Sequence, residues 1–114
     1  MKSDRVIPSD PLEFIRQCVR ERNLLWTYHV QMRLEGRSIP RSAILESVNT
    51  YEVIESYPED KYLPSYLVFA QYHGDVMHIL FATDVSGRNV RVVTAYKPDP
   101  TEWESDLRTR RTNV

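Results

Sequence analysis

The chain has 114 residues, a net charge of −1, 41% hydrophobic residues and 27% charged residues. This length suits one domain, because small chains bury too little surface for two separate cores. No apolar run approaches the roughly 18 residues that a membrane span needs, and the N-terminus lacks the apolar stretch of a secretion signal. We therefore expect one globular, cytoplasmic domain over residues 10–111, preceded by a flexible arm over residues 1–9.

The charges are unevenly distributed along the chain. Residues 46–60 hold five acids and no base, residues 85–98 hold three bases and no acid, and three arginines lie close to the C-terminus. A local basic surface permits nucleic-acid binding, although a strongly basic chain would indicate it directly. Ordinary solvated charges are the alternative. Cys18 is the only cysteine, so the chain forms no internal disulfide and no cysteine-based metal site.

Three helices are expected in the first half of the chain. Asp10 can cap free backbone N–H groups and Pro11 suits the first helical position, so a helix begins there. Thr27 is a second capping residue, and Gly36 ends the following helix in the manner of a C-cap. Pro40 opens a third helix, which ends near residue 49.

The pattern then changes to runs rich in β-branched and aromatic residues, which favour strands. We expect four antiparallel strands, over about residues 51–57, 65–73, 76–84 and 89–97. A short helix carrying Trp103 and Leu107 follows. Because helices and strands are segregated, the predicted fold class is α+β, with N-terminal helices packed on a four-stranded antiparallel sheet and a short C-terminal helix.

The strand register predicts which residues share a face of the sheet. A two-residue turn at residues 74–75 places Gln71 opposite His78, on the more polar face. The other, apolar face should pack on the helices. For the next hairpin two alternatives stay open. A four-residue loop over residues 85–88 places Arg91 and Lys97 on the face of His78, whereas a loop one residue longer or shorter places Thr94 and Tyr96 there.

The chemistry that this sequence supports is limited. It contains no phosphate-cradling glycine loop, zinc-binding cysteine pair or nucleophile elbow. Its three histidines lack ligand spacing, so we expect neither a metal nor a cofactor. The remaining His, Arg, Lys and Tyr side chains suffice for metal-free RNA cleavage. That reaction needs a base for the ribose 2′-hydroxyl, an acid for the leaving oxygen and a cation for the phosphate charge.

Particular residues are candidates for these roles. His78 is the main candidate for proton transfer, because histidine titrates nearest neutrality, and Tyr96 is a second acid–base or orienting group. His29 and Arg33 lie four residues apart on a predicted helix and are candidates for substrate positioning and transition-state charge. The alternative is that the histidines only pack or bond to backbone. Expected phosphate contacts come from Arg33, Arg37, Arg91 and Lys97.

Several short motifs occur in an order that resembles a known group of proteins. They cover residues 28–33, 37–40, 53–60, 66–68, 77–79 and 93–99. In that order they resemble an uncharacterised bacterial family of toxin-like domains, grouped with the RelE/ParE superfamily of toxin–antitoxin systems. The resemblance covers roughly residues 25–111, and the order and spacing of the motifs carry its specificity.

This resemblance implies a compact fold like that of microbial RNases and a toxin of a type II toxin–antitoxin system. Some members of the superfamily cut mRNA without a metal, and they act either on free mRNA or on mRNA bound to the ribosome. Other members inhibit gyrase and show no nuclease activity. The implied partners are RNA and a cognate antitoxin, often a zinc-finger or helix-turn-helix protein. The family pattern includes His29, Arg33, His78 and Tyr96, with no established catalytic role. A non-enzymatic inhibitor or interaction domain is the alternative function.

Overall fold

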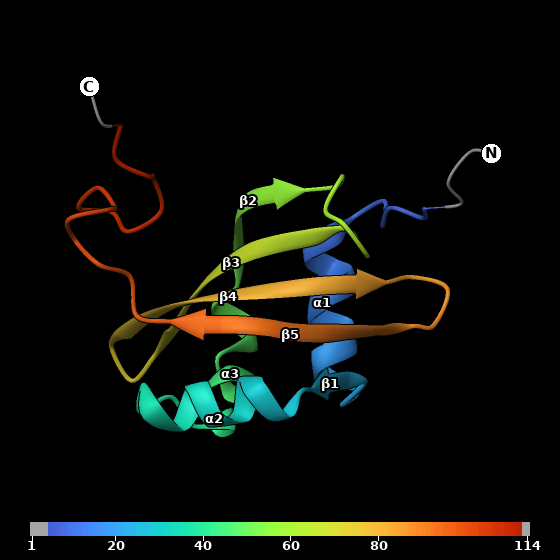
Figure 1. The fold of residues 1–114 in the computed structure, drawn as a ribbon, viewed down its shortest axis with the longest axis horizontal. Coiled ribbons are helices and arrows are strands. Elements are labelled where there is room, and N and C mark those ends of the chain that lie inside the picture. Colours follow the sequence, from blue (N-terminus) through green and yellow to red (C-terminus); the bar gives the residue numbers. More distant parts are fainter. Residues whose placement is uncertain (1–4, 113–114) are drawn as a thin grey trace.

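A computed structural model describes residues 5–112 as a five-stranded sheet with two helices behind it and a third beside one edge (Figure 1). The elements are α1 (Pro11–Arg20), β1 (Leu24–Trp26), α2 (Tyr28–Gly36), α3 (Arg41–Glu46), the 3₁₀ turn η1 (Val48–Thr50), β2 (Glu52–Tyr57), β3 (Ser65–Tyr72), β4 (Asp75–Asp84) and β5 (Asn89–Tyr96). The strand order is β1-β5-β4-β3-β2. The α+β class is confirmed, and the neighbours among β2, β3, β4 and β5 pair antiparallel. The purely antiparallel sheet was wrong, because β1 adds a parallel strand beside β5.

The helix starts follow the predicted caps. The Asp10 carboxylate accepts a hydrogen bond from the Glu13 backbone N–H at 3.1 Å, and Pro11 occupies the first turn of α1. Thr27 Oγ1 accepts from the Val30 N–H at 3.0 Å and begins α2. The predicted C-cap at Gly36 was wrong in detail, because α2 includes Gly36 and the left-handed residue is Ser38, with φ of 58°.

The short strand β1 was missed because three residues carry too little periodicity to detect. Arg22, with φ of 63°, turns the chain after α1. The next residues then run parallel to β5, with Leu24 beside Val90 and Trp26 beside Val92. Leu24 is buried in the core, and β1 covers this edge of the sheet beside Val90 to Val92, in the first half of β5.

The first β-hairpin turns one residue earlier than expected. His73 and Gly74, with φ of 52° and 85°, form the turn, as two-residue hairpins that need positive φ at both positions do. Phe69, rather than Gln71, therefore lies opposite His78. Moving the turn by one residue moves each partner by two, so the predicted division into a polar and an apolar face is unaffected.

The second hairpin combines the two alternatives that the sequence left open. Its loop has four residues, since Asp84 pairs with Asn89, and Arg91 accordingly lies beside Ala82 on the face of His78. A bulge then leaves Val93 without a partner on β4. Because a bulge changes the alternation of side chains, the residue opposite His78 is Tyr96.

The apolar face of the sheet packs on the helices, as expected. Ile15 and Val19 from α1 and Ile44 from α3 are buried against strands β3, β4 and β5. Tyr51 is also fully buried, and its hydroxyl donates to the Ile44 carbonyl at 2.6 Å. None of the helices within residues 5–112 is long and apolar enough to cross a membrane.

The predicted C-terminal helix is absent from the described residues. Residues 99–111, here called the strap, instead form an irregular hairpin with one bridge between Trp103 and Arg110. The Asp106 carboxylate accepts from the backbone N–H groups of Arg108 and Thr109, and Leu107 has φ of 58°. Side-chain-to-backbone bonds of this kind compete with the helical hydrogen-bond pattern.

The predicted N-terminal arm is described only from residue 5, and residues 1–4 lie outside the described part of the chain. Residues 5–9 contain no helix or strand. The Arg5 guanidinium donates to the carbonyl oxygens of Pro58 and Lys61, both at 3.3 Å. The arm thus contacts the loop between β2 and β3.

Candidate functional site

The sheet face turned away from α1 and α3 is called the open face (Figure 1). It carries residues from three neighbouring strands: Leu67 and Phe69 of β3, His78, Leu80 and Ala82 of β4, and Arg91, Thr94 and Tyr96 of β5. One end of this face lies beneath the strap, and the remainder borders two cavities.

His78 lies under the strap and is fully buried, with 0% of its surface exposed. Its Nε2 lies 2.7 Å from the Leu107 carbonyl oxygen, and its Nδ1 lies 3.3 Å from the Tyr96 hydroxyl. A carbonyl can only accept, so Nε2 carries the proton and Nδ1 accepts from Tyr96. Burial lowers the pKa of His78, which favours this neutral form.

The strap is fastened by an aromatic ring and two ion pairs. Trp103, 1% exposed, contacts the His78 ring edge-on with 4.4 Å between centroids. Arg108 forms a bidentate pair with Glu52, with both N–O distances 2.9 Å, and lies 3.9 Å over the Phe69 ring.

Arg110 makes a parallel set of contacts two residues further along the strap. It forms a bidentate pair with Glu55 at 3.0 Å and lies 4.5 Å over the Trp103 ring. Burial opposes ionisation of Glu55, but hydrogen bonds from Arg110 and Tyr57 lower its pKa overall. Two strap arginines therefore bind two glutamates of the edge strand β2.

Beside the strap is a cavity of about 350 Å³, here called the polar cavity. It is lined by Tyr57, Asp60, Leu67, Leu80, Thr94, Tyr96 and Arg110. Burial raises the pKa of Tyr96, and burial together with the hydrogen bond to Glu55 raises that of Tyr57. Both phenols are therefore protonated donors at neutral pH. A guanidinium has five N–H donors, so Arg110 retains donors beyond the two that bind Glu55.

A second cavity, of about 520 Å³, adjoins the first and is here called the apolar cavity. It is lined by Thr27, Val30, Asp60, Lys61, Tyr62, Leu63, Ala82, Arg91, Val92 and Val93. Tyr62 is 82% exposed. Asp60 lines both cavities, and the two together are here called the groove.

The wall of this groove is the loop over residues 58–64. Asp60 Oδ2 accepts from Ser65 Oγ at 2.6 Å and Oδ1 accepts from the Lys61 N–H at 2.9 Å. These two bonds lower the pKa of Asp60, so it is a carboxylate at neutral pH.

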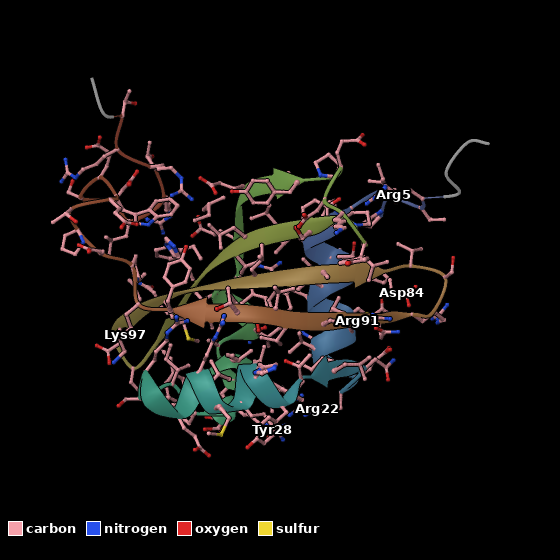
Figure 2. All side chains as sticks on the ribbon, viewed as in Figure 1. Arg5, Arg22, Tyr28, Asp84, Arg91 and Lys97 are labelled. Carbon is pink, nitrogen blue, oxygen red and sulfur yellow. The ribbon has the colours of Figure 1, made fainter. Side chains whose placement is uncertain are left out.

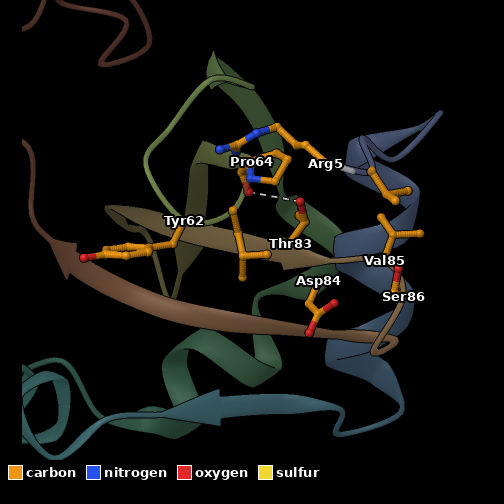
Figure 3. Close-up of a pocket in the computed structure, with 9 residues that line it drawn as sticks. Arg5, Tyr62, Pro64, Thr83, Asp84, Val85 and Ser86 are labelled. Carbon is orange, nitrogen blue, oxygen red and sulfur yellow. Dashed lines mark hydrogen bonds between the residues drawn. The ribbon is translucent and has the colours of Figure 1, made fainter. Parts of the chain in front are cut away.

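The same loop is held from behind. A cavity of about 260 Å³ separates it from the arm and from β4, and at its floor buried Thr83 donates to the Pro64 carbonyl at 3.0 Å (Figure 3). Tyr62 extends away from Arg5 and over β5 (Figure 3). The loop thus presents Asp60 and Tyr62 to the groove.

The structure brings together four of the predicted site residues. His78 and Tyr96 are hydrogen-bonded partners, and Arg91 lines the apolar cavity, paired with Asp84 at 3.4 Å. Arg37 Nη1 donates to Thr94 Oγ1 at 3.1 Å and to the Ala95 carbonyl at 2.8 Å. It therefore reaches the edge of the polar cavity from the end of α2.

The other three predicted residues lie elsewhere. His29 and Arg33 are exposed on α2, and among the described residues neither lines the groove. Lys97 lies at the opposite end of β5 from Arg91 (Figure 2) and lines a small cavity beside α3. The expected phosphate-binding set is thus spread over several surfaces.

Sequence reasoning missed Tyr57, Asp60 and Arg110 as site residues. Arg110 was counted only among the arginines close to the C-terminus, and Asp60 lies between the strands expected over residues 51–57 and 65–73. One signal was present, because the acidic run of residues 46–60 and the C-terminal arginines are complementary in charge. Among residues 5–112, no three His, Cys, Asp or Glu side chains are grouped as a metal site requires.

The chain matches the family described as "Domain of unknown function (DUF4258)" over residues 26–100. This match covers more than half of the chain, so the protein belongs to that family. It includes all of the groove-lining residues except Arg110. No curated protein and no solved structure matches the chain.

Proposed function

We propose that this member of the DUF4258 family is the toxin of a type II toxin–antitoxin system, with a RelE-like fold, and that it cuts mRNA without a metal. The observation that carries the proposal is the polar cavity. There two protonated phenols and a guanidinium converge on an exposed sheet face, and His78 holds one of the phenols from behind.

Each group in the polar cavity has a role in the proposed cleavage. Tyr57 takes the proton of the ribose 2′-hydroxyl and passes its own proton to Glu55, to which it is hydrogen-bonded. The 2′-oxygen attacks phosphorus, and the Tyr96 hydroxyl turns its single proton from His78 Nδ1 to the leaving 5′-oxygen and protonates it as that bond breaks. Arg110 stabilises the charge that develops on the phosphate oxygens.

In this proposal His78 acts on Tyr96 rather than on the RNA. It is fully buried and both ring nitrogens have partners, so it is a positioning residue. Arg37 and Arg91 extend the phosphate-binding surface to the two ends of the groove. An RNA strand longer than the groove is needed to contact Arg33, His29 or Lys97.

Binding of single-stranded RNA tests the cavity, and the strap supplies a matched pair of variants. Arg110→Gln and Arg108→Gln each remove one bidentate ion pair to β2 and one contact over an aromatic ring. Only Arg110 lines the polar cavity. We expect Arg110→Gln to weaken binding and to lower the salt dependence by about one phosphate contact, while Arg108→Gln binds as the parent does. Equal affinity for both variants would contradict the proposal.

A second candidate function is a non-enzymatic inhibitor or an interaction domain. Exposed apolar residues of β1 and α2 favour it: Leu25 is 50%, Tyr28 73% and Met32 52% exposed. Tyr28 and Met32 are one turn apart on α2, as in surfaces that receive an amphipathic helix of a partner such as an antitoxin. Growth arrest with intact mRNA in cells that express the chain would support an inhibitor, whereas mRNA loss would support the nuclease.

A further inference from the structure

The two halves of the groove differ in chemistry, which restricts the ligand that fits both. The polar cavity is lined by hydroxyl and guanidinium groups, whereas the lining of the apolar cavity includes Ala82, Val92 and Val93. A molecule that places an anionic phosphodiester beside a flat, largely apolar ring matches this arrangement. A nucleotide within a single strand has that chemistry, because its base is not held in a duplex.

The apolar cavity has a surface on which a base can stack. Tyr62 is 82% exposed, and the Lys61 ammonium lies over one face of its ring, 5.3 Å from the centroid, which leaves the other face for a base. Stacking on an exposed aromatic side chain contributes to the binding of any base. Stacking alone therefore explains affinity for single strands, and it gives no preference between bases.

Asp60 adds a group that distinguishes bases. Asp60 lines both cavities, and each oxygen of its carboxylate already accepts one hydrogen bond, from Ser65 or from the Lys61 N–H. These bonds fix its orientation, and a carboxylate has about four acceptor sites, so each oxygen can accept another hydrogen bond. Guanine presents two adjacent N–H donors, N1–H and N2–H. Adenine and cytosine present an amino group beside an acceptor nitrogen, and uracil presents one N–H between two carbonyls.

We propose that the apolar cavity is a base-binding subsite and that Asp60 makes it selective for guanine. The base stacks on Tyr62, its N1–H and N2–H donate to the two Asp60 oxygens, and its phosphate lies in the polar cavity. This inference rests on the proposed RNA-binding function and adds the base that the groove selects.

Binding of four short oligouridylates that differ at one central position tests the subsite. The central residue is guanosine, adenosine, cytidine or uridine, and affinity is measured by fluorescence anisotropy with non-cleavable 2′-O-methyl strands. A good bidentate contact to a base is worth about 1–3 kcal/mol, so we expect the parent to prefer the guanosine strand roughly 5- to 150-fold. Asp60→Asn should abolish this preference, because the amide replaces one acceptor with a donor. The strands with central adenosine, cytidine or uridine should bind this variant as tightly as they bind the parent.

Asp84→Asn is the matched control. Asp84 is a partly buried acid that pairs with Arg91 but does not itself line the groove. It should keep the guanosine preference. A parent that binds all four strands equally, or an Asp60→Asn variant that retains the preference with an unchanged thermal melt, overturns the subsite and leaves the proposed function standing. A parent that binds none of the strands overturns both.

Discussion

The two ends of the open face belong to the same strands and yet differ in what they expose. At the strap end, His78, Phe69 and Trp103 are buried and every polar atom of His78 has a partner. At the other end, Tyr62 is exposed and Arg91 borders a cavity. β4 runs unbroken through both ends, and the bulge at Val93 keeps polar β5 side chains on the open face at each end. The strap therefore decides which polar groups meet solvent.

Tyr96 lies at the border between these ends. Its hydroxyl contacts buried His78, while the side chain also lines the polar cavity. His78 thus orients the Tyr96 side chain from the buried side, and a ligand can reach it from the polar cavity. This arrangement suits a proton donor, because the covered end fixes its position before any ligand arrives.

The largest effect should come from removing the ring that fastens the strap. Trp103→Ala deletes a large side chain with 1% exposure, and buried aromatic truncations cost about 3–5 kcal/mol. Urea denaturation followed by circular dichroism measures the loss. Tyr28→Ala, at a residue 73% exposed, is the control and should change stability by no more than about 0.5 kcal/mol. Similar midpoints for both variants would show that the strap contributes little to the fold.

A smaller, pH-dependent effect should come from His78. Burial lowers its pKa below the ordinary 6.5, so the unfolded chain takes up the proton first as pH falls. The stability that neutral His78 contributes is therefore present above about pH 6.5 and is lost as pH falls through the lowered pKa.

Urea midpoints measured between pH 7.5 and 5 report this dependence, because the usual pKa of a glutamate such as Glu52 or Glu55 lies below that pH range. His78→Gln should reduce stability at pH 7.5 by about 1–3 kcal/mol, because the bonds to Leu107 and Tyr96 are lost or weakened. It should also flatten the slope between pH 6.5 and 5. A variant with the parent's slope would assign the pH dependence to another group.

The smallest effect concerns the free part of the β5 edge. Arg37 donates to the Ala95 carbonyl beyond the point where β1 stops pairing. Arg37→Met should lower stability by about 0.5–1.5 kcal/mol, the usual net value of one hydrogen bond. Arg33→Met, on the exposed surface of α2, is the control and should have no measurable effect. Equal thermal melts for the two variants would contradict a role for Arg37 in closing this edge.

Much of the fold could be predicted because local signals agreed with the tertiary structure. Asp10 and Thr27 cap helices as their sequence context predicts, and four strands follow the runs of β-branched and aromatic residues. β1 could not be predicted, because its three residues are a strand only through pairing with β5. A short helix carrying Trp103 and Leu107 was predicted within the strap, and the bonds of Asp106 to the backbone that compete with it could not be read from the sequence.

The candidate site was predictable only in part, for a different reason. His78 and Tyr96 could be placed near one face, but the bulge at Val93 that makes them direct neighbours has no clear signal in the sequence. Arg110 and Asp60 enter the groove through the strap and a loop, and the paths of such irregular segments depend on tertiary contacts. His29 and Arg33 were predicted as site residues from helical spacing alone. That spacing shows that they share one side of α2, but it does not show that this side faces solvent.

The most direct test of the account is cleavage of single-stranded RNA by the purified chain in the presence of EDTA. The variants are Tyr96→Phe, which removes only the hydroxyl at the border of the two ends, and Tyr28→Phe, the same change on the exposed surface of α2. We predict that the parent and Tyr28→Phe cut at equal rates. Tyr96→Phe should be slower by about 10²–10⁴-fold, the usual contribution of general acid catalysis. Its thermal melt should still show a cooperatively folded chain, with a midpoint lowered because buried His78 Nδ1 loses its donor. No cleavage by the parent, or cleavage by Tyr96→Phe at the parent's rate, would contradict the account.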